Sequence, residues 1–206
     1  MHVLKAAVFA MFLLAQAAPS HADLPGWGDT RWGMSRDDLA RSLGDALRPL
    51  GGRLSYDGAY ATHGVDGVAV GGVPFRAVFQ MAEETDGLVQ VLLQPEGKQP
   101  PESFLRPVHD ALRDALGEPA RACVTPGTGG GPLSIEILWR FPTTTVHLSM
   151  FDFRSPAMLS NDPNLDPDPL TPYYETRLNN PRFLPRRILI RYHATADENL
   201  MSDCRP

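Results

Sequence analysis

Alternation of apolar and polar positions marks one pair of neighbouring segments as a β-hairpin. In the first segment, one face of an extended chain would carry Phe75, Ala77, Phe79 and Met81, and the other Arg76, Val78 and Gln80. A Thr-Asp-Gly turn follows at 85–87, and the apolar run 88–93 returns as the partner strand. This is the clearest hairpin that the sequence predicts.

Two segments instead repeat their apolar residues at helical spacing. The first runs from 36 to 43, with an extension to 47 as the alternative, because Gly44 interrupts the pattern. Ser35 and Asp38 before and within its first turn resemble a capping box. The second helix is expected over 102–116, with regular geometry starting nearer 106 because of Pro107.

Further strand-like pieces complete the pattern, and a long irregular segment rich in Pro, Asn and Asp fills 155–185. The pieces are 53–62, 67–74, 120–125, 133–141, 143–153 and 186–193. The order helix, strands, helix, strands favours an α+β fold: an antiparallel sheet with two main helices packed on one face. Because the order occurs twice, it also suggests two helix-plus-meander halves.

The first 22 residues have the features of a cleavable signal peptide. Lys5 precedes ten apolar residues, and Ser20-His21-Ala22 is a small-x-small triplet before Asp23. Ten residues are too few to cross a hydrocarbon core, which needs about 20. A cut after Ala17 is the alternative. We therefore expect an exported, periplasmic or secreted protein, without membrane insertion after cleavage and with the segment 27–34 as its first strand.

The remaining residues, 23–206, have a suitable length for a single domain. All 24 acidic residues and 18 of the 19 basic ones lie in this part. The acidic balance argues against nucleic acid as a partner, because nucleic-acid binding requires a concentrated basic surface.

Two cysteines, Cys123 and Cys204, remain after cleavage. In an oxidising compartment an even pair is expected to form a disulfide. That bridge would close a loop of about 80 residues and stabilise the fold by at most about 4–5 kcal/mol. Two unrelated thiols are the alternative.

The nine residues from Arg31 to Leu39, which read Arg-Trp-Gly-Met-Ser-Arg-Asp-Asp-Leu, resemble a recurring opening of small exported bacterial α+β proteins. In those proteins a short strand ending in Trp-Gly-Met-Ser or Trp-Gly-Met-Thr enters an amphipathic helix. Their architecture is similar to the helix-plus-meander units of periplasmic assembly-factor lipoproteins and of the β-lactamase-inhibitor protein. The resemblance implies a fold rather than a function, and this chain lacks the lipidation cysteine of the lipoproteins. In this reading Trp32 packs under the helix, Gly33 permits the turn and Ser35 caps the helix.

The long segment 155–185 contains the candidate binding residues. Its oxygen-bearing side chains Asp162, Asn164, Asp166 and Asp168 alternate as in a calcium-binding EF-hand loop. The glycine of that motif is replaced by Pro167 and its final glutamate by Tyr173, so the alternative is a solvated loop stiffened by proline. The aromatic residues Tyr173, Tyr174 and Phe183 are candidates for contact with a partner.

No catalytic set is indicated by the sequence. The glycine-rich run 127–131 lacks the Lys-Ser/Thr that follows in a phosphate-binding loop, and no Gly-x-Ser-x-Gly occurs. The histidines after the signal peptide, at 63, 109, 147 and 193, do not have the spacing of metal ligands, and a surface or hydrogen-bonded role is expected for each.

Three functions remain open on this basis. The leading one is a non-catalytic, protein-binding module of the cell envelope or exterior, of the inhibitor, immunity or assembly type. The second is a binder of a small ligand or calcium through 155–185, with no other cofactor expected. The third is a hydrolase whose polar residues come together from separate strands.

Overall fold

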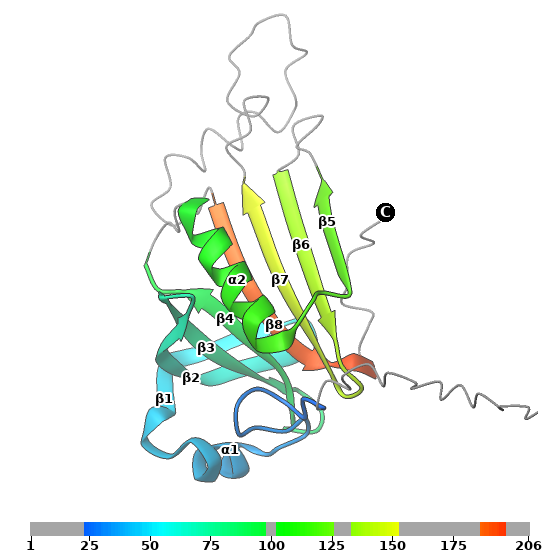
Figure 1. Cartoon of the computed structure of the whole chain (residues 1–206). Coiled ribbons are helices and arrows are strands. Elements are labelled where there is room, and N and C mark those ends of the chain that lie inside the picture. The colour runs from blue at the N-terminus through cyan, green and yellow to red at the C-terminus, as the bar shows by residue number, and fades with distance from the viewer. Residues whose placement is uncertain (1–22, 98–101, 126–132, 153–185, 197–206) are drawn as a thin grey trace, which may run out of the picture.

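The computed structural model describes residues 23–97, 102–125, 133–152 and 186–196 (Figure 1). These residues form one open, eight-stranded antiparallel sheet with two short α-helices. The expected antiparallel sheet is therefore confirmed, and strands account for most of the regular structure. None of the helices in these ranges is both long and apolar enough to cross a membrane.

The first half of the chain is a helix followed by a four-stranded meander. Its elements are α1 (Arg36–Leu43), a 3₁₀ turn (Gly44–Ala46), β1 (Arg48–Tyr56), β2 (Ala59–Val70), β3 (Val73–Ala82) and β4 (Leu88–Pro95). Each strand pairs with the next one in antiparallel orientation. The predicted hairpin is confirmed as β3 and β4, in which Phe79 lies opposite Val91.

The second half repeats this order. Its elements are a 3₁₀ turn (Glu102–Phe104), α2 (Leu105–Leu116), β5 (Arg121–Thr125), β6 (Leu133–Arg140), β7 (Thr144–Asp152) and β8 (Arg186–Ala194). The strand order is β1-β2-β3-β4-β8-β7-β6-β5, so the last strands of the two halves pair at the centre. The repeated order of elements in the sequence thus corresponds to two four-stranded meanders joined in one sheet (Figure 1).

One face of the sheet carries the apolar core. On β3 the side chains of Phe75, Ala77, Phe79 and Met81 are all buried, as their alternation predicts. The same buried cluster includes Leu39 of α1 and Val108 and Leu112 of α2. Burial of these apolar side chains drives the docking of both helices, because a helix this short is marginal by itself in water.

The start of α1 is fixed by the predicted capping box. The Ser35 hydroxyl accepts a hydrogen bond of 3.2 Å from the Asp38 amide, and the Asp38 carboxylate accepts one of 3.3 Å from the Ser35 amide. The helix ends at Leu43, and the chain continues as a 3₁₀ turn rather than as a longer α-helix. The shorter of the two predicted helix lengths is therefore confirmed.

Close contact between Gly71 and Pro107 places α2 against the turn between β2 and β3. A Cβ atom on Gly71 would lie 2.1 Å from the Pro107 carbonyl oxygen, and the φ of Gly71 is +58°, so only glycine fits. At the other end of α2, the indole of Trp139 on β6 donates a 2.8 Å hydrogen bond to the Gly117 carbonyl. The α-helix begins at Leu105 after a 3₁₀ turn, close to the predicted start.

The segment 27–34 is not the strand that the sequence predicted. It folds as consecutive turns, because Gly33 has a φ of +80° and the amide of Thr30 bonds back to the Trp27 carbonyl at 3.1 Å. Two backbone hydrogen bonds of 2.8 Å still attach its end to Leu88 at the start of β4. Trp32 packs partly buried against the core.

The piece 53–62 is not a single strand either. It contains a hairpin turn at the dipeptide Asp57-Gly58, which connects β1 to β2. The aromatic residues Tyr56 and Tyr60 obscured this boundary, because both favour strands and lie on either side of the turn.

Candidate functional site

A cavity of about 310 Å³ lies between α1, β2 and β3, and we call it the α1 pocket. Its volume is at the lower end of the range of ligand-binding pockets. The lining combines apolar side chains with four polar ones. The apolar residues are Leu39, Ala40, Leu47, Phe79 and Met81, and the polar residues are Arg36, Asp37, Thr62 and His63.

An irregularity in β2 brings two consecutive polar residues to this pocket. Tyr60 pairs with Met81 but His63 pairs with Phe79, so β2 contains one residue more than β3 between these pairs. Such a β-bulge changes the direction of the side chains beside it. Thr62 and His63 can therefore both line the pocket, whereas regular alternation would place them on opposite faces.

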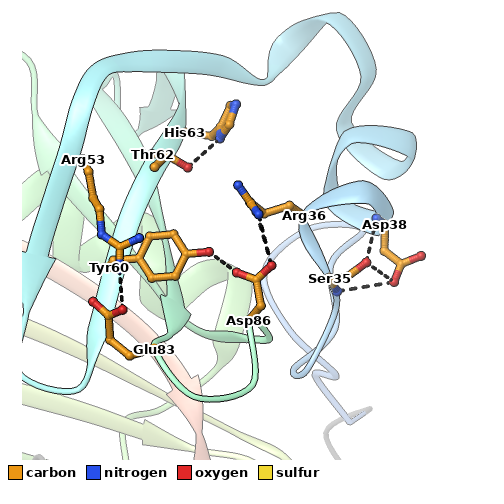
Figure 2. Close-up of polar contacts among 9 residues, drawn as sticks. All are labelled: Ser35, Arg36, Asp38, Arg53, Tyr60, Thr62, His63, Glu83 and Asp86. Carbon is orange, nitrogen blue, oxygen red and sulfur yellow. Dashed lines mark hydrogen bonds and ion pairs between the residues drawn. The ribbon is translucent and has the colours of Figure 1, made fainter.

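The helical side of the pocket is held by polar contacts to the turn between β3 and β4. The Arg36 guanidinium donates to the Asp86 carboxylate at 3.3 Å, and the same carboxylate accepts a hydrogen bond from the buried Tyr60 hydroxyl. Figure 2 shows Arg36 between Asp86 on one side and the Thr62–His63 pair on the other. These contacts link α1 to the β3–β4 turn at the edge of the pocket.

A second set of contacts extends this network along β1. The Arg53 guanidinium carbon lies 3.8 Å from the centre of the Tyr60 ring, and Arg53 also forms an ion pair with Glu83 (Figure 2). Both partners of the ion pair are about half exposed, so its contribution to stability is small. Its effect is to hold Tyr60, which in turn orients Asp86.

Three ion pairs lie around the pocket. Arg36 pairs with Asp86, Arg41 with Asp38 and Arg53 with Glu83. Within the described ranges, the carboxylate of Asp37 forms no ion pair. Hydrogen bonds from the side chain and backbone of Ser35 lower the pKa of Asp38. The pocket rim thus carries, beside the paired Arg36 guanidinium, a carboxylate at Asp37 that forms no ion pair with a described residue.

His63 is oriented by its neighbour. Its Nδ1 lies 2.9 Å from the Thr62 hydroxyl, which leaves Nε2 as the ring nitrogen without a hydrogen bond to a described residue. The hydroxyl group beside this histidine in the pocket is that of Thr62, and the lining residues include no serine or cysteine. Among the described residues, no three His, Cys, Asp or Glu side chains lie close enough together to hold a metal ion.

The sheet face opposite the core, which we call the far face, carries a second polar cluster. It includes Gln80, Gln90, Thr145, His147, Ser149 and His193, all of which are buried. The Gln90 amide donates to Gln80 at 2.8 Å, and the Ser149 hydroxyl lies 3.3 Å from Nε2 of His147. Of the two roles expected for His147 and His193, the hydrogen-bonded one is confirmed, since both are buried and His193 contacts the Ala194 carbonyl at 3.0 Å.

Burial lowers the pKa of His147. The negative charge of Glu136 acts in the opposite direction, and Arg191 and His193 act in the same direction as burial. The buried Nε of Arg191 has no hydrogen-bond partner within the described part of the chain. The imidazole of His147 is consequently held in its neutral form near pH 7.

The residues singled out in the sequence lie mostly outside the described ranges. This applies to Asp162, Asn164, Asp166 and Asp168, to Tyr173, Tyr174 and Phe183, to Cys204 and to the glycine-rich run 127–131. Cys123 lies on β5, opposite Glu136 of β6. The calcium site, the partner contact and the disulfide therefore stay predictions.

The pocket residues were missed because their sequence context suggested other roles. Asp37 falls in the first turn of the predicted helix 36–43, where an acidic residue complements the positive end of the helix, and Thr62 ends the strand-like piece 53–62. The available signal was the pair Thr62-His63, since two consecutive polar residues interrupt the alternation of a strand.

No protein-family model, curated protein or solved structure matches the chain. The assignment of a function therefore depends on the geometry of the α1 pocket and of the far face.

Proposed function

We propose that this protein is an exported, non-catalytic module that binds another protein of the cell envelope or exterior through the α1 pocket. The observation that carries the proposal is the pocket itself, which combines an apolar floor with a polar rim. Pockets of this kind accept an anchoring side chain from a partner, and such anchors provide much of the binding energy of an interface. The inhibitor, immunity and assembly types all fit this mode of action.

The position of the helices supports this mode of binding. Leu39 of α1 and Leu112 of α2 belong to one buried cluster with the apolar side chains of the sheet. We infer that both helices cover the same face, so that α1 presents its exposed side beside the pocket mouth. Arg36, Asp37 and Ala40 are exposed there and available to a partner.

The far face supports a hydrolase less well than the α1 pocket supports protein binding. Ser149 and His147 are within reach of a weak hydrogen bond, and Glu136 lies opposite Ser149 on the neighbouring strand. However, Ser149 is only 3 % exposed and His147 only 6 %. A nucleophile must reach its substrate, so this arrangement favours a structural role for the pair.

Export is part of the proposal and has its own test. The carboxylate of Asp23 accepts a 2.8 Å hydrogen bond from the Thr143 hydroxyl, so the residue directly after the expected cleavage site belongs to the fold. N-terminal sequencing of the protein recovered from outside the cytoplasm should begin at Asp23. A protein that retains residues 1–22 and stays in the cytoplasm would contradict export.

The binding function can be tested with a pair of matched substitutions. Ala40 lines the pocket, and Ala115 is an exposed alanine on α2. Ala40→Trp should block the pocket, whereas Ala115→Trp adds the same side chain elsewhere. In affinity purifications from the envelope of the producing cell, we expect a protein that is captured by the wild type and by Ala115→Trp but is lost with Ala40→Trp. Equal capture by all three would contradict the role of the pocket, and repeated failure to capture any protein would contradict the function.

A further inference from the structure

We propose that the α1 pocket receives a Lys or Arg side chain from a basic segment of the partner. This inference rests on the proposed function and specifies the chemical group that the pocket recognises. It follows from the shape of the pocket, the charge left at its rim and the hydrogen-bonding state of His63.

The floor of the pocket suits an aliphatic stem. Leu39 is 2 % exposed, and Phe79 and Met81 are 1 % and 2 % exposed, so these core side chains form the apolar floor of the pocket. Lys and Arg bury their methylene stems against such surfaces while the charged head stays near water. The pocket is open to solvent at the exposed residues Arg36 and Asp37, which allows that arrangement.

The charge at the rim selects a cation. The three ion pairs around the pocket already use Arg36, Arg41 and Arg53, and within the described ranges Asp37 is the acidic lining residue without an ion pair. A carboxylate or phosphate would meet the charge of Asp37 unfavourably, whereas an ammonium or guanidinium would compensate it. The whole chain has a net charge of −5, which favours the approach of a basic partner.

The Thr62–His63 pair can provide a hydrogen-bond acceptor on the sheet side of the pocket. In the tautomer whose Nδ1–H donates to the Thr62 hydroxyl, Nε2 of His63 carries a lone pair. An ammonium or guanidinium N–H can donate to that nitrogen. A purely apolar side chain would use only the floor of the pocket.

The probe for this inference is the capped pentapeptide acetyl-Gly-Gly-Lys-Gly-Gly-amide, titrated into the full protein and followed by NMR of ¹³C-labelled methyl groups. The matched peptides carry norleucine, which keeps the stem without the charge, or glutamate in place of lysine. We expect saturable shifts of the methyl signals of Leu39, Leu47 and Met81 with the lysine peptide. Norleucine should bind about two- to fivefold more weakly, the range expected for one exposed ion pair, and glutamate more weakly still.

Substitution of Asp37 separates charge recognition from simple apolar contact. Asp37→Asn should reduce affinity for the lysine peptide to that for the norleucine peptide, and Asp37→Glu should restore part of it. Asp114→Asn, the same change at an exposed site on α2, should have no effect. Unchanged dispersion of the amide signals will verify that each variant is folded.

Any one of three results would overturn this inference. They are equal affinity for the lysine and norleucine peptides, no effect of Asp37→Asn on affinity, and no methyl shift with any peptide. The outcome is independent of the capture experiment. If Ala40→Trp abolishes capture but the peptides show no preference for lysine, the proposed function stands. The inference that the pocket binds a basic side chain is then wrong. If the lysine peptide binds but no cellular protein is captured, the pocket recognises the group and the protein-binding function is wrong.

Discussion

The indole Nε1 of Trp32 donates a hydrogen bond of 2.8 Å to the hydroxyl of Thr144, although the two residues are 112 positions apart in the chain. The Thr144 hydroxyl in turn donates to the carbonyl of Leu24. These contacts connect the segment before α1, in the first half, to the start of β7 in the second half. The N-terminal segment therefore joins the two meanders in addition to the pairing of β4 with β8.

Replacing Trp32 tests this connection. Trp32→Phe keeps an aromatic ring but removes the donor to Thr144, so we expect the free energy of unfolding in urea to fall by about 1–2 kcal/mol. Trp27→Phe is the control, because Trp27 contacts the core through its ring, which lies 5.7 Å from that of Phe79. A loss for Trp32→Phe no greater than that of the control would show that the hydrogen bond is unimportant.

Ser35 should be required for the stability of α1. Ser35→Ala removes the side-chain acceptor for the Asp38 amide, and loss of an N-cap costs about 1 kcal/mol. Chemical denaturation followed by circular dichroism measures the change. Ser55→Ala, at an exposed position on β1, provides a matched substitution that should change stability little. Identical stabilities of the two variants would contradict the role of the capping box.

The buried imidazole of His147 should make stability depend on pH. Its pKa is lowered from the ordinary value of 6.5 by burial, so the unfolded chain binds a proton more readily than the folded one. The stabilising effect of the neutral form is complete above about pH 6.5, and it is lost as the pH falls from there through the lowered pKa.

Thermal unfolding of the wild type and of His147→Gln between pH 4 and 8 measures this dependence. The wild type should lose melting temperature more steeply below pH 6.5 than the variant does. His109→Gln, at a partly exposed histidine on α2, should keep the steep dependence of the wild type. The same slope in wild type and His147→Gln would exclude His147 as the cause.

The predicted bridge between Cys123 and Cys204 can be tested without further structural information. If it forms, the purified protein unfolded without reductant should contain no thiol that reacts with iodoacetamide. Cys204→Ser should reveal one reactive thiol and lower the free energy of unfolding by at most about 4–5 kcal/mol. Two alkylated cysteines in the unreduced wild type would show that the bridge is absent.

Local patterns in the sequence were sufficient for the elements whose stability is local. The alternation around Phe79 predicted the β3–β4 hairpin, and Ser35 with Asp38 predicted the start of α1. Both signals depend on residues only a few positions apart. The prediction of a strand over 27–34 was wrong. The residue type shows that Gly33 can adopt a positive φ, but not that it does so in this fold.

The candidate site could not be predicted, because distant segments create it. The α1 pocket requires the bulge of β2 near Thr62 and the attachment of Arg36 to Asp86, 50 residues away. The burial of His147 on the far face likewise depends on tertiary packing. Alternation alone gives no information about such packing.

The central claim is that the α1 pocket is the surface through which the protein recognises its partner. The most direct test places the photo-crosslinking amino acid p-benzoylphenylalanine at position 41, where Arg41 is exposed on α1 beside the pocket without lining it, and in a second variant at position 115 on α2. After irradiation of the producing cells, we predict one dominant crosslinked product of defined mass from position 41 and none of that mass from position 115. The same product from both positions, or no product from position 41 in a protein that is exported and folded, would contradict the claim.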